Sequence, residues 1–474
     1  MPTAPWSFLI IAFLPGLYLF RLFLLRPAYI LYALALAVSF IAVNINIGFT
    51  IYVSRLLLLI LAVVIMLRVS MRQTEGLCLR MDPVFFTLFA GTIFVQSLSL
   101  PFVQSPFEHA RMMFIYLSMM AIFTAVLILG TGTAVIVKTL RFYLGFGVVQ
   151  GLVGMYQTIG AVARWPTYQA LIYGRYISTI KTGNPRNLMG TFWSAYDNMA
   201  RAFGFLSDVN HYGGYLVGII VLALAFIVYN RRDVLAHAAL FAGGTGLMFS
   251  LSRSAWVTLA MFGIPIIIVL MRRGGFTSAF RRPFIVIGLA AVLFLAAGVV
   301  VQRAGLFDIK AVVSKRIFSF LSNRSSAEDH IKTRLMALEA WQSSPLIGIG
   351  MDYPVNPWYS PKYNDLWGGA HSHHLNVLAG NGILGLALEW SFMAVVFLYM
   401  WRGLIRSRPQ SLEGAAMAGL LTAYAAILLG NFLYHYYLND FVWFIMGCGV
   451  ALGRGIIREA KASEGAGCRE RVEL

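Results

Sequence analysis

Charged side chains are scarce in this sequence, and their scarcity limits the kind of protein it can be. Asp, Glu, Lys and Arg make up 12% of the 474 residues, which is about half the fraction of a typical soluble domain. Hydrophobic residues make up 59%, and the mean hydropathy is +0.75. One soluble core cannot bury that much apolar surface, so most of it must face lipid. The composition argues against a soluble enzyme and predicts a helical protein that crosses a membrane many times.

Cysteine is also scarce. Cys78, Cys448 and Cys468 are scattered along the chain, and this pattern implies neither a disulfide framework nor a metal site. The first apolar segment lacks a basic region before it and a small-residue cleavage site after it. It is therefore expected to be a membrane helix and not a removed signal peptide.

Acidic residues are few beside basic ones, 19 against 37, and the formal net charge is +18. A charge of this size could indicate nucleic-acid binding. The Lys and Arg residues lie in short clusters between apolar runs, however, which is the distribution that the positive-inside rule produces. The expected partner is therefore the anionic lipid of a bilayer, with no nucleic acid.

Apolar runs of about 20 residues, long enough to cross a bilayer, predict an all-α polytopic membrane protein with about 12–13 transmembrane helices. The expected spans are 7–24, 27–45, 51–68, 83–100, 110–130, 141–160, 209–229, 234–250, 254–271, 283–302, 375–401, 413–435 and 440–456. The chain then divides into N-terminal helices (1–160), a polar segment (161–208), central helices (209–302), a large polar loop (303–370), C-terminal helices (371–456) and a tail (457–474).

Clusters of arginine set the orientation of these spans. Counting spans places every cluster on one side, whereas the connections Asn44–Gly48 and Pro101–Pro106 on the other side hold almost no Lys or Arg. The clustered side is therefore cytoplasmic, and both long polar segments lie outside. The clustered residues are Arg68, Arg72, Arg80, Arg231, Arg232, Arg272, Arg273, Arg281, Arg282, Arg402, Arg406, Arg408, Arg454 and Arg458. The outer segments also carry basic residues, which an anionic ligand outside, or simple contact with water and headgroups, would explain.

Arg201 is the first candidate for binding such an anion. It precedes Gly204 and the turn Asp208–Asn210, which predicts a helix start capped by Asp208 or Asn210. Arg201 would then lie just above the membrane, near the positive end of a helix dipole, a good place for a phosphate. The alternative is a snorkelling arginine that only anchors the helix.

Arg253 is the second candidate, because it lies in the shortest outer turn, within Ser250–Trp256. An arginine that faces the bundle at membrane depth is costly unless it is paired, which makes it a functional candidate. An interfacial arginine beside Trp256 is the alternative.

The sharpest candidate is a histidine cluster at the outer end of a span. His371, His373 and His374 fall within four residues and precede a glycine-rich stretch, Gly380–Gly385. The three do not share one helical face, and no Cys or Glu nearby completes a ligand pattern, so no metal is expected. A histidine at a water–membrane boundary is suited to accept a proton near neutral pH.

A fourth element precedes the histidines. Arg334, Trp341 and Pro345, followed by Gly348-Ile-Gly350, predict an amphipathic outer helix that lies over the site.

These residues together resemble the O-antigen ligase family. His371-Ser372, nine residues and then Gly382-Ile-Leu-Gly385 match that family's pattern of His-[Asn/Ser/Gln], nine residues, Gly, two residues and Gly. The elements around Arg201–Asn210, Arg253 and Arg334–Gly350 are also similar to it and follow in the family's order, over roughly residues 195–390. The family includes O-antigen ligases, some polysaccharide polymerases and bacterial protein O-oligosaccharyltransferases.

The resemblance implies a GT-C-like membrane glycosyltransferase in the bacterial inner membrane, with a large periplasmic loop that carries short helices. It implies metal-independent transfer, with no cofactor and with inversion, of a glycan from undecaprenyl pyrophosphate to an acceptor hydroxyl at the periplasmic face. His371 would be the base, Arg201 and Arg253 the pyrophosphate ligands, and Arg334 a weaker candidate ligand. The motif residues are Asn210, Gly350, Gly382 and Gly385.

Several points stay open at this stage. His374 follows His373 directly, where many relatives carry another residue, so His373 or His374 could share the role of His371. The acceptor could be the lipid A core, another lipid-linked repeat or a protein. A transporter or flippase of lipid-linked sugars, whose arginines bind pyrophosphate without chemistry, is an alternative from another class.

Overall fold

The structure is a computed structural model, and it describes residues 17–40, 44–46, 50–79, 82–162, 193–194, 199–206, 208–273, 324–353, 369–408 and 410–470. The described helices are α2 (Ala28–Ala37), α3 (Val53–Ser70), α4 (Pro83–Leu98), α5 (Pro106–Leu129), α6 (Thr133–Val162), α10 (Val209–Tyr229), α11 (Val234–Ser250), α12 (Arg253–Val257), α13 (Ile264–Arg273), α16 (Arg324–Ser343), α17 (His373–Arg406), α18 (Leu412–Gly430) and α19 (Asp440–Glu470). A 3-10 helix, η1 (Leu100–Phe102), and a π-helical stretch, η3 (Thr258–Gly263), are also present. Two short antiparallel ribbons, β1 (Asn44–Asn46) with β2 (Thr50–Tyr52) and β3 (Trp193–Ser194) with β4 (Met199–Ala200), complete the described elements.

The protein is an all-α polytopic membrane protein. Within the described residues, nine helices are long and apolar enough to cross a membrane, and Ala28–Ala37 and Val234–Ser250 are shorter apolar helices. These eleven correspond in order to eleven of the predicted spans. The predicted span 283–302 lies outside the described residues, as does most of 7–24.

Helix α10 occupies the centre of the bundle, where nearly every residue from Val209 to Val228 is buried. It packs against α11 and α18, and α19 packs against α17 and α5. Side-chain caps explain where several helices begin: Asp208, Asp233 and Ser411 accept hydrogen bonds from the first backbone N–H groups of α10, α11 and α18. The predicted cap at Asp208 is confirmed.

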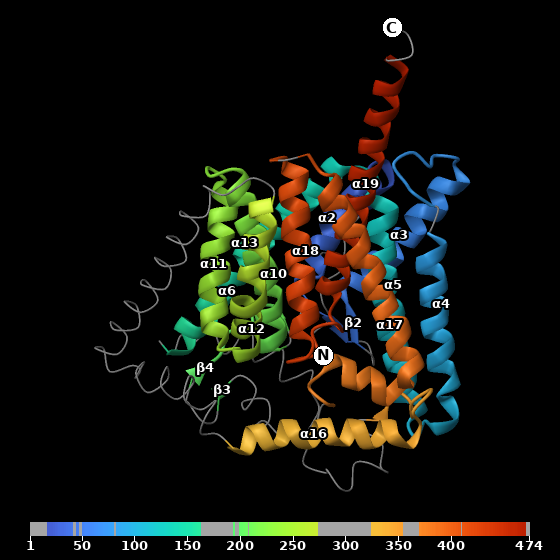
Figure 1. Cartoon of the computed structure of the whole chain (residues 1–474), viewed down its shortest axis with the longest axis vertical. Helices are drawn as coiled ribbons and strands as arrows, with labels where there is room; N and C mark the ends of the chain where they lie inside the picture. Colours follow the sequence, from blue (N-terminus) through green and yellow to red (C-terminus); the bar gives the residue numbers. More distant parts are fainter. Residues whose placement is uncertain are drawn as a thin grey trace, which may run out of the picture.

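The two ends of the bundle differ in character. Helix α16 lies across one end, which we call the α16 end, and the last turns of α19 project from the opposite end (Figure 1). The loops at that opposite end carry the clustered arginines, for example Arg231 and Arg232 between α10 and α11 and Arg406 at the close of α17.

Helix α17 is bent at Gly382, whose φ of 65° and ψ of −167° are not helical. The backbone groups that the bend releases are paired with the loop after α16: Ile383 and Leu384 donate to the carbonyls of Pro345 and Leu346, at 2.9 and 3.2 Å. Because a lipid environment offers no other partners, a membrane helix can break only where protein groups replace its hydrogen bonds.

The same loop donates back to α17. The amides of Ile349 and Gly350 donate to the carbonyls of Ala379 and Gly380, at 3.0 and 2.9 Å. The approach is so close that a Cβ on Gly348 would lie 2.3 Å from the carbonyl carbon of Gly380. Gly348 and Gly382 are therefore both needed for this close contact between two backbones.

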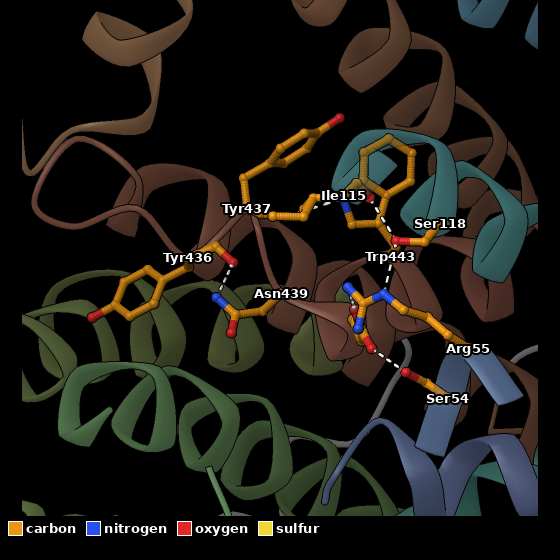
Figure 2. Close-up of polar contacts among 9 residues, drawn as sticks. Ser54, Arg55, Ile115, Ser118, Tyr436, Tyr437, Asn439 and Trp443 are labelled. Carbon is orange, nitrogen blue, oxygen red and sulfur yellow. Dashed lines mark hydrogen bonds and ion pairs between the residues drawn. The ribbon is translucent and has the colours of Figure 1, made fainter. Parts of the chain in front are cut away.

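A buried polar contact joins the N-terminal helices to the C-terminal ones (Figure 2). The guanidinium of Arg55, at the start of α3, donates to Ser118 of α5 at 3.2 Å and lies 3.8 Å from the carboxylate of Asp440, the first residue of α19. Ser54 donates to the same carboxylate, and the guanidinium lies 4.2 Å from the centre of the Tyr52 ring. This pair anchors the beginning of α19.

We expect Gly382→Ala to destabilise the protein. The alanine Cβ would lie 2.3 Å from the backbone of Leu346, and the backbone conformation is one that only glycine adopts readily. The expected loss from backbone strain alone is about 1–3 kcal/mol, measured as a lower thermal unfolding temperature of the purified protein in detergent. Gly244→Ala in α11 is the matched control, because a Cβ there meets nothing within 4 Å. Equal unfolding temperatures for the two variants would contradict this account of the bend.

We expect Arg55→Met to lower the unfolding temperature strongly, because it leaves the buried Asp440 carboxylate without its cation. Removing one partner of a buried pair costs about 3–5 kcal/mol, and the double variant Arg55→Met/Asp440→Asn should recover much of that loss. Arg406→Met is the control, since Arg406 and Glu464 form an exposed pair at 4.0 Å that should contribute little. A single variant as stable as the wild type would show that the pair does not anchor α19.

Candidate active site

Three segments distant in sequence meet at the α16 end: the start of α10, the residues before α17 and the loop between α18 and α19. They form a cluster of Asp208, His211, His371, Tyr434 and His435, which we call the histidine cluster. The ring centres of His371 and Tyr434 are 5.9 Å apart, and those of His371 and His435 are 6.2 Å apart. The ring centres of His211 and His435 are 5.2 Å apart, and the Tyr434 hydroxyl donates to the Asp208 carboxylate at 3.2 Å.

The backbone at His371 is held in an unusual conformation. Its φ of 48° lies in the left-handed region, which non-glycine residues seldom adopt. Asn376 stabilises this turn, because its side-chain oxygen accepts from the amide of Ala370 at 2.8 Å and from the hydroxyl of Tyr353. Such backbone strain persists only where the surroundings enforce it, and it is concentrated at functional sites.

Burial sets the charges in the histidine cluster. Burial, together with the neighbouring His211, lowers the pKa of His435 to about 3, so that its ring is neutral at neutral pH. Burial also opposes ionisation of Asp208, but His211 and the amides of His211 and Asn210 outweigh it and lower the pKa of the carboxyl. The Nδ1 atom of His435 is buried and makes no hydrogen bond to the described residues. A polar group of a ligand could bind to this atom.

Arg201 reaches the site from a turn that two buried glutamines of α6 hold. The side-chain oxygen of Gln157 accepts from the amides of Phe203 and Gly204, and that of Gln150 accepts from Phe205. The Arg201 guanidinium donates to the carbonyls of Ser250 and Leu251, at 3.1 and 3.3 Å.

The position of Arg201 differs in part from the prediction. We expected it at the positive end of the α10 dipole, and its donors contact carbonyls at the negative end of α11. Free carbonyls at a helix end attract a cation, and this local attraction explains the difference.

The turn before α12 brings Asn210 and Arg253 to the same place. Ser252 caps α12 and donates to the side chain of Asn210 at 2.8 Å. On the other side of Arg253, Ser254 accepts from the hydroxyl of Tyr436 at 3.0 Å. Arg253 therefore begins its helix between two serines that contact α10 and the loop after α18.

Helix α16 lies across this end of the bundle (Figure 1), in the region where the sequence predicts an amphipathic helix. Its buried side, with Met336, Ala337 and Ala340, packs against the residues around α17. Arg334 donates to the carbonyl of Phe432 at 3.2 Å, and its Nε is buried with no hydrogen-bond partner among the residues that the structure describes.

The three predicted histidines separate in the structure. His371 joins the histidine cluster, whereas His373 faces inward, where its Nε2 lies 2.8 Å from a carboxylate oxygen of Glu389. His374 accepts from the indole of Trp390 at 3.2 Å. His373 therefore contacts a buried acid, and the predicted role of His373 as a helper to His371 remains a prediction.

Sequence reasoning missed Asp208 as a member of the site, and also Glu389, Tyr434 and His435. Two signals were available. Glu389 is an acidic residue in an otherwise apolar span, which marks a functional candidate, and Tyr434–Tyr437 is an aromatic run at a span end. We had assigned part of that run to the span 413–435, but α18 ends at Gly430.

In the described part of the chain, no three His, Cys, Asp or Glu side chains are arranged to hold a metal ion. The metal-independent mechanism remains a prediction from the family resemblance.

Comparison with known proteins bears on the identity of this site. Residues 237–388 match the family model of the O-antigen ligases (Wzy_C), and a search of curated proteins finds no match. The matched stretch begins in α11 and ends in α17, so it includes Arg253, Arg334 and His371. Over these residues, about a third of the chain, the protein is similar to the O-antigen ligases.

Proposed function

We propose that this protein transfers a glycan from undecaprenyl pyrophosphate to an acceptor hydroxyl at the periplasmic face of the bacterial inner membrane. The family indicates a glycosyltransferase-like membrane enzyme of the ligase or polymerase type; the donor, the residue roles and the location are our proposal. The observation that supports it most is the meeting of His371, in strained backbone, with Asp208, Tyr434 and His435, next to the segments that carry Arg201 and Arg253.

His371 is the proposed general base. The acceptor hydroxyl attacks C1 of the donor sugar with inversion, the bond from C1 to the phosphate oxygen breaks, and His371 takes the hydroxyl proton. An effective base needs a pKa near the working pH, which an ordinary histidine has. His435, with a pKa of about 3, is too weak a base for this step at neutral pH.

Arg201 and Arg253 are the proposed ligands of the leaving pyrophosphate. Negative charge develops on that group as its bond to C1 breaks, and fixed positive charge there stabilises the transition state. A guanidinium suits this role because its planar fork can bind two phosphate oxygens at once. Arg334, whose Nε is buried without a partner in the described part of the chain, is a further candidate ligand.

The distribution of charge supports a periplasmic site. The loops opposite the α16 end carry the clustered arginines, and positive loops face the cytoplasm. The histidine cluster would then lie at the periplasmic surface of the inner membrane. There a lipid-linked donor would keep its tail in the bilayer and its pyrophosphate within reach of the cluster.

The experiment that tests the function is glycan transfer by the purified full chain in detergent or vesicles. Undecaprenyl-pyrophosphate glycan is the donor, and lipid A core, a second lipid-linked repeat or a protein is offered in turn. The product identifies the acceptor and so shows whether the enzyme is a ligase, a polymerase or a protein O-oligosaccharyltransferase. Movement of the donor across the vesicle bilayer, with no transfer to any acceptor, would favour a flippase instead.

We expect His371→Ala to reduce the transfer rate by at least about 100-fold, the effect of losing a general base. Donor binding should be unchanged, because the arginine ligands remain. Transfer and donor binding are measured separately on the same preparation. If the variant transfers glycan at the wild-type rate, His371 is not the base.

We expect Arg201→Lys and Arg253→Lys each to slow transfer about 10-fold or more, because lysine keeps the charge but loses the fork. Arg406→Lys, in an exposed pair at the opposite end, should transfer at the wild-type rate. Steady-state kinetics with varied donor concentration provides the measurement. An unchanged kcat/KM for the donor would remove the substituted arginine from the proposed ligands.

A further inference from the structure

The bend in α17 brings together residues that are sixteen positions apart. In a straight α-helix such residues are separated by about 24 Å along the axis. Here the Nε2 of His373 lies 2.8 Å from Glu389, and the indole of Trp390 donates to His374 at 3.2 Å. Both contacts join the short segment before Gly382 to the long segment after it, so they hold the bend closed from its inner side.

Glu389 is buried inside the bundle, with 6% of its side chain exposed. Its ion-pair partners in the described part of the chain are His373 and His374, at 2.8 and 3.8 Å, with no lysine or arginine among them. The other titratable groups that face it are the hydroxyls of three buried tyrosines from α5, α18 and the loop before α19: Tyr116, Tyr424 and Tyr437.

A buried carboxylate is costly for a membrane protein, and stability alone does not explain it. Transfer of an acidic side chain to the centre of a membrane helix costs a few kcal/mol at least. Well-packed apolar residues would often stabilise the same place as well or better. The position of Glu389 therefore requires a reason beyond packing.

His373 connects Glu389 to the site. The ring of His373 stacks on Tyr437, with 4.5 Å between ring centres, and its backbone amide donates to the carbonyl of Asn431 at 3.2 Å. Asn431 in turn accepts from the amide of Tyr437 at 2.9 Å. These contacts hold the loop that carries Tyr434 and His435, while His373 itself is two residues from His371.

We propose that Glu389 is a positioning residue for glycan transfer: through His373, its carboxylate holds His371 against Tyr434 and His435. This inference rests on the function proposed above. Glu389 does not touch the histidine cluster, so its effect on the reaction is to fix the geometry of the proposed base.

The chemistry of the contact makes the carboxylate specific. One oxygen of Glu389 accepts from His373, and the other lies near His374, whose Nδ1 already accepts from Trp390. In Glu389→Gln one oxygen becomes an NH₂ group, which donates a hydrogen bond where the carboxylate accepted one. Glu389→Asp keeps the carboxylate but moves it away from His373 by the length of one methylene group.

The test is steady-state transfer by the purified full chain carrying Glu389→Gln, with undecaprenyl-pyrophosphate glycan as the varied substrate. We expect kcat to fall about 10- to 100-fold, as when a reacting group is misplaced by about 1 Å. The donor KM should stay within about twofold, because Arg201 and Arg253 are not affected. Glu389→Asp should recover part of the lost kcat.

Asp233→Asn is the matched control. Asp233 is also a buried carboxylate, paired with Arg141 at 2.9 Å, but it caps α11 at the opposite end of the bundle. Asparagine can still cap the helix, and kcat per folded molecule should equal that of the wild type.

Two results would overturn the proposal. One is a wild-type kcat for Glu389→Gln, counted per folded molecule; the other is an equal loss of kcat in Asp233→Asn. If Glu389→Gln does not fold, His373→Gln and His373→Ala are compared instead. Glutamine keeps a hydrogen-bond donor toward Glu389, so His373→Gln should retain a higher kcat than His373→Ala. Equal kcat in these two variants would also overturn the proposal.

The reference variant His371→Ala separates this inference from the proposed function. If His371→Ala abolishes transfer and Glu389→Gln leaves it intact, the base is supported and the positioning role is wrong. If His371→Ala transfers normally, the proposed function of His371 is wrong, whatever Glu389→Gln does.

Discussion

The bend at Gly382 is the constraint on which the candidate site depends. A helix in lipid must replace every backbone hydrogen bond that it gives up, and the loop Pro345–Gly350 provides the replacements by pairing with both sides of the bend. This pairing turns the start of α17 away from the direction of its long segment and delivers His371 to the start of α10. The loop, the bend and the histidine therefore form one structural unit, which explains why their motifs occur together in the sequence.

Local features of this site could be predicted from sequence because their physical causes are local. Runs of apolar residues match the described spans, since bilayer thickness determines helix length. Asp208 was predicted as one of two caps because a short acceptor before an apolar run satisfies free amides. The amphipathic pattern around Arg334 likewise predicted α16. Gly350 and Gly382 were identified as motif residues, although the hydrogen bonds between their two segments were not predicted.

The remaining features depend on contacts between distant segments, which no spacing in one sequence reveals. Tyr434 meets Asp208 across 226 positions, and Arg201 ends at the carbonyls of α11 instead of the dipole of α10. Helical periodicity also could not predict which of His371 and His373 faces inward, because it assumes a straight helix. The bend brings Glu389 to His373. This contact shows that His373 faces inward, whereas His371 belongs to the histidine cluster.

The charges around the site constrain how two substrates could enter it. Asp208 remains ionised beside His211 and His435, and its negative charge would repel a pyrophosphate from the histidine cluster. Arg201 contacts Leu251, and Arg253 follows Ser252, which donates to Asn210. The positive electrostatic potential that attracts an anion is therefore found around Leu251–Arg253. On the proposed function, the donor pyrophosphate therefore binds toward the arginines and the acceptor hydroxyl toward the histidines. The sugar C1 would then lie between them, which is the in-line arrangement that inversion requires.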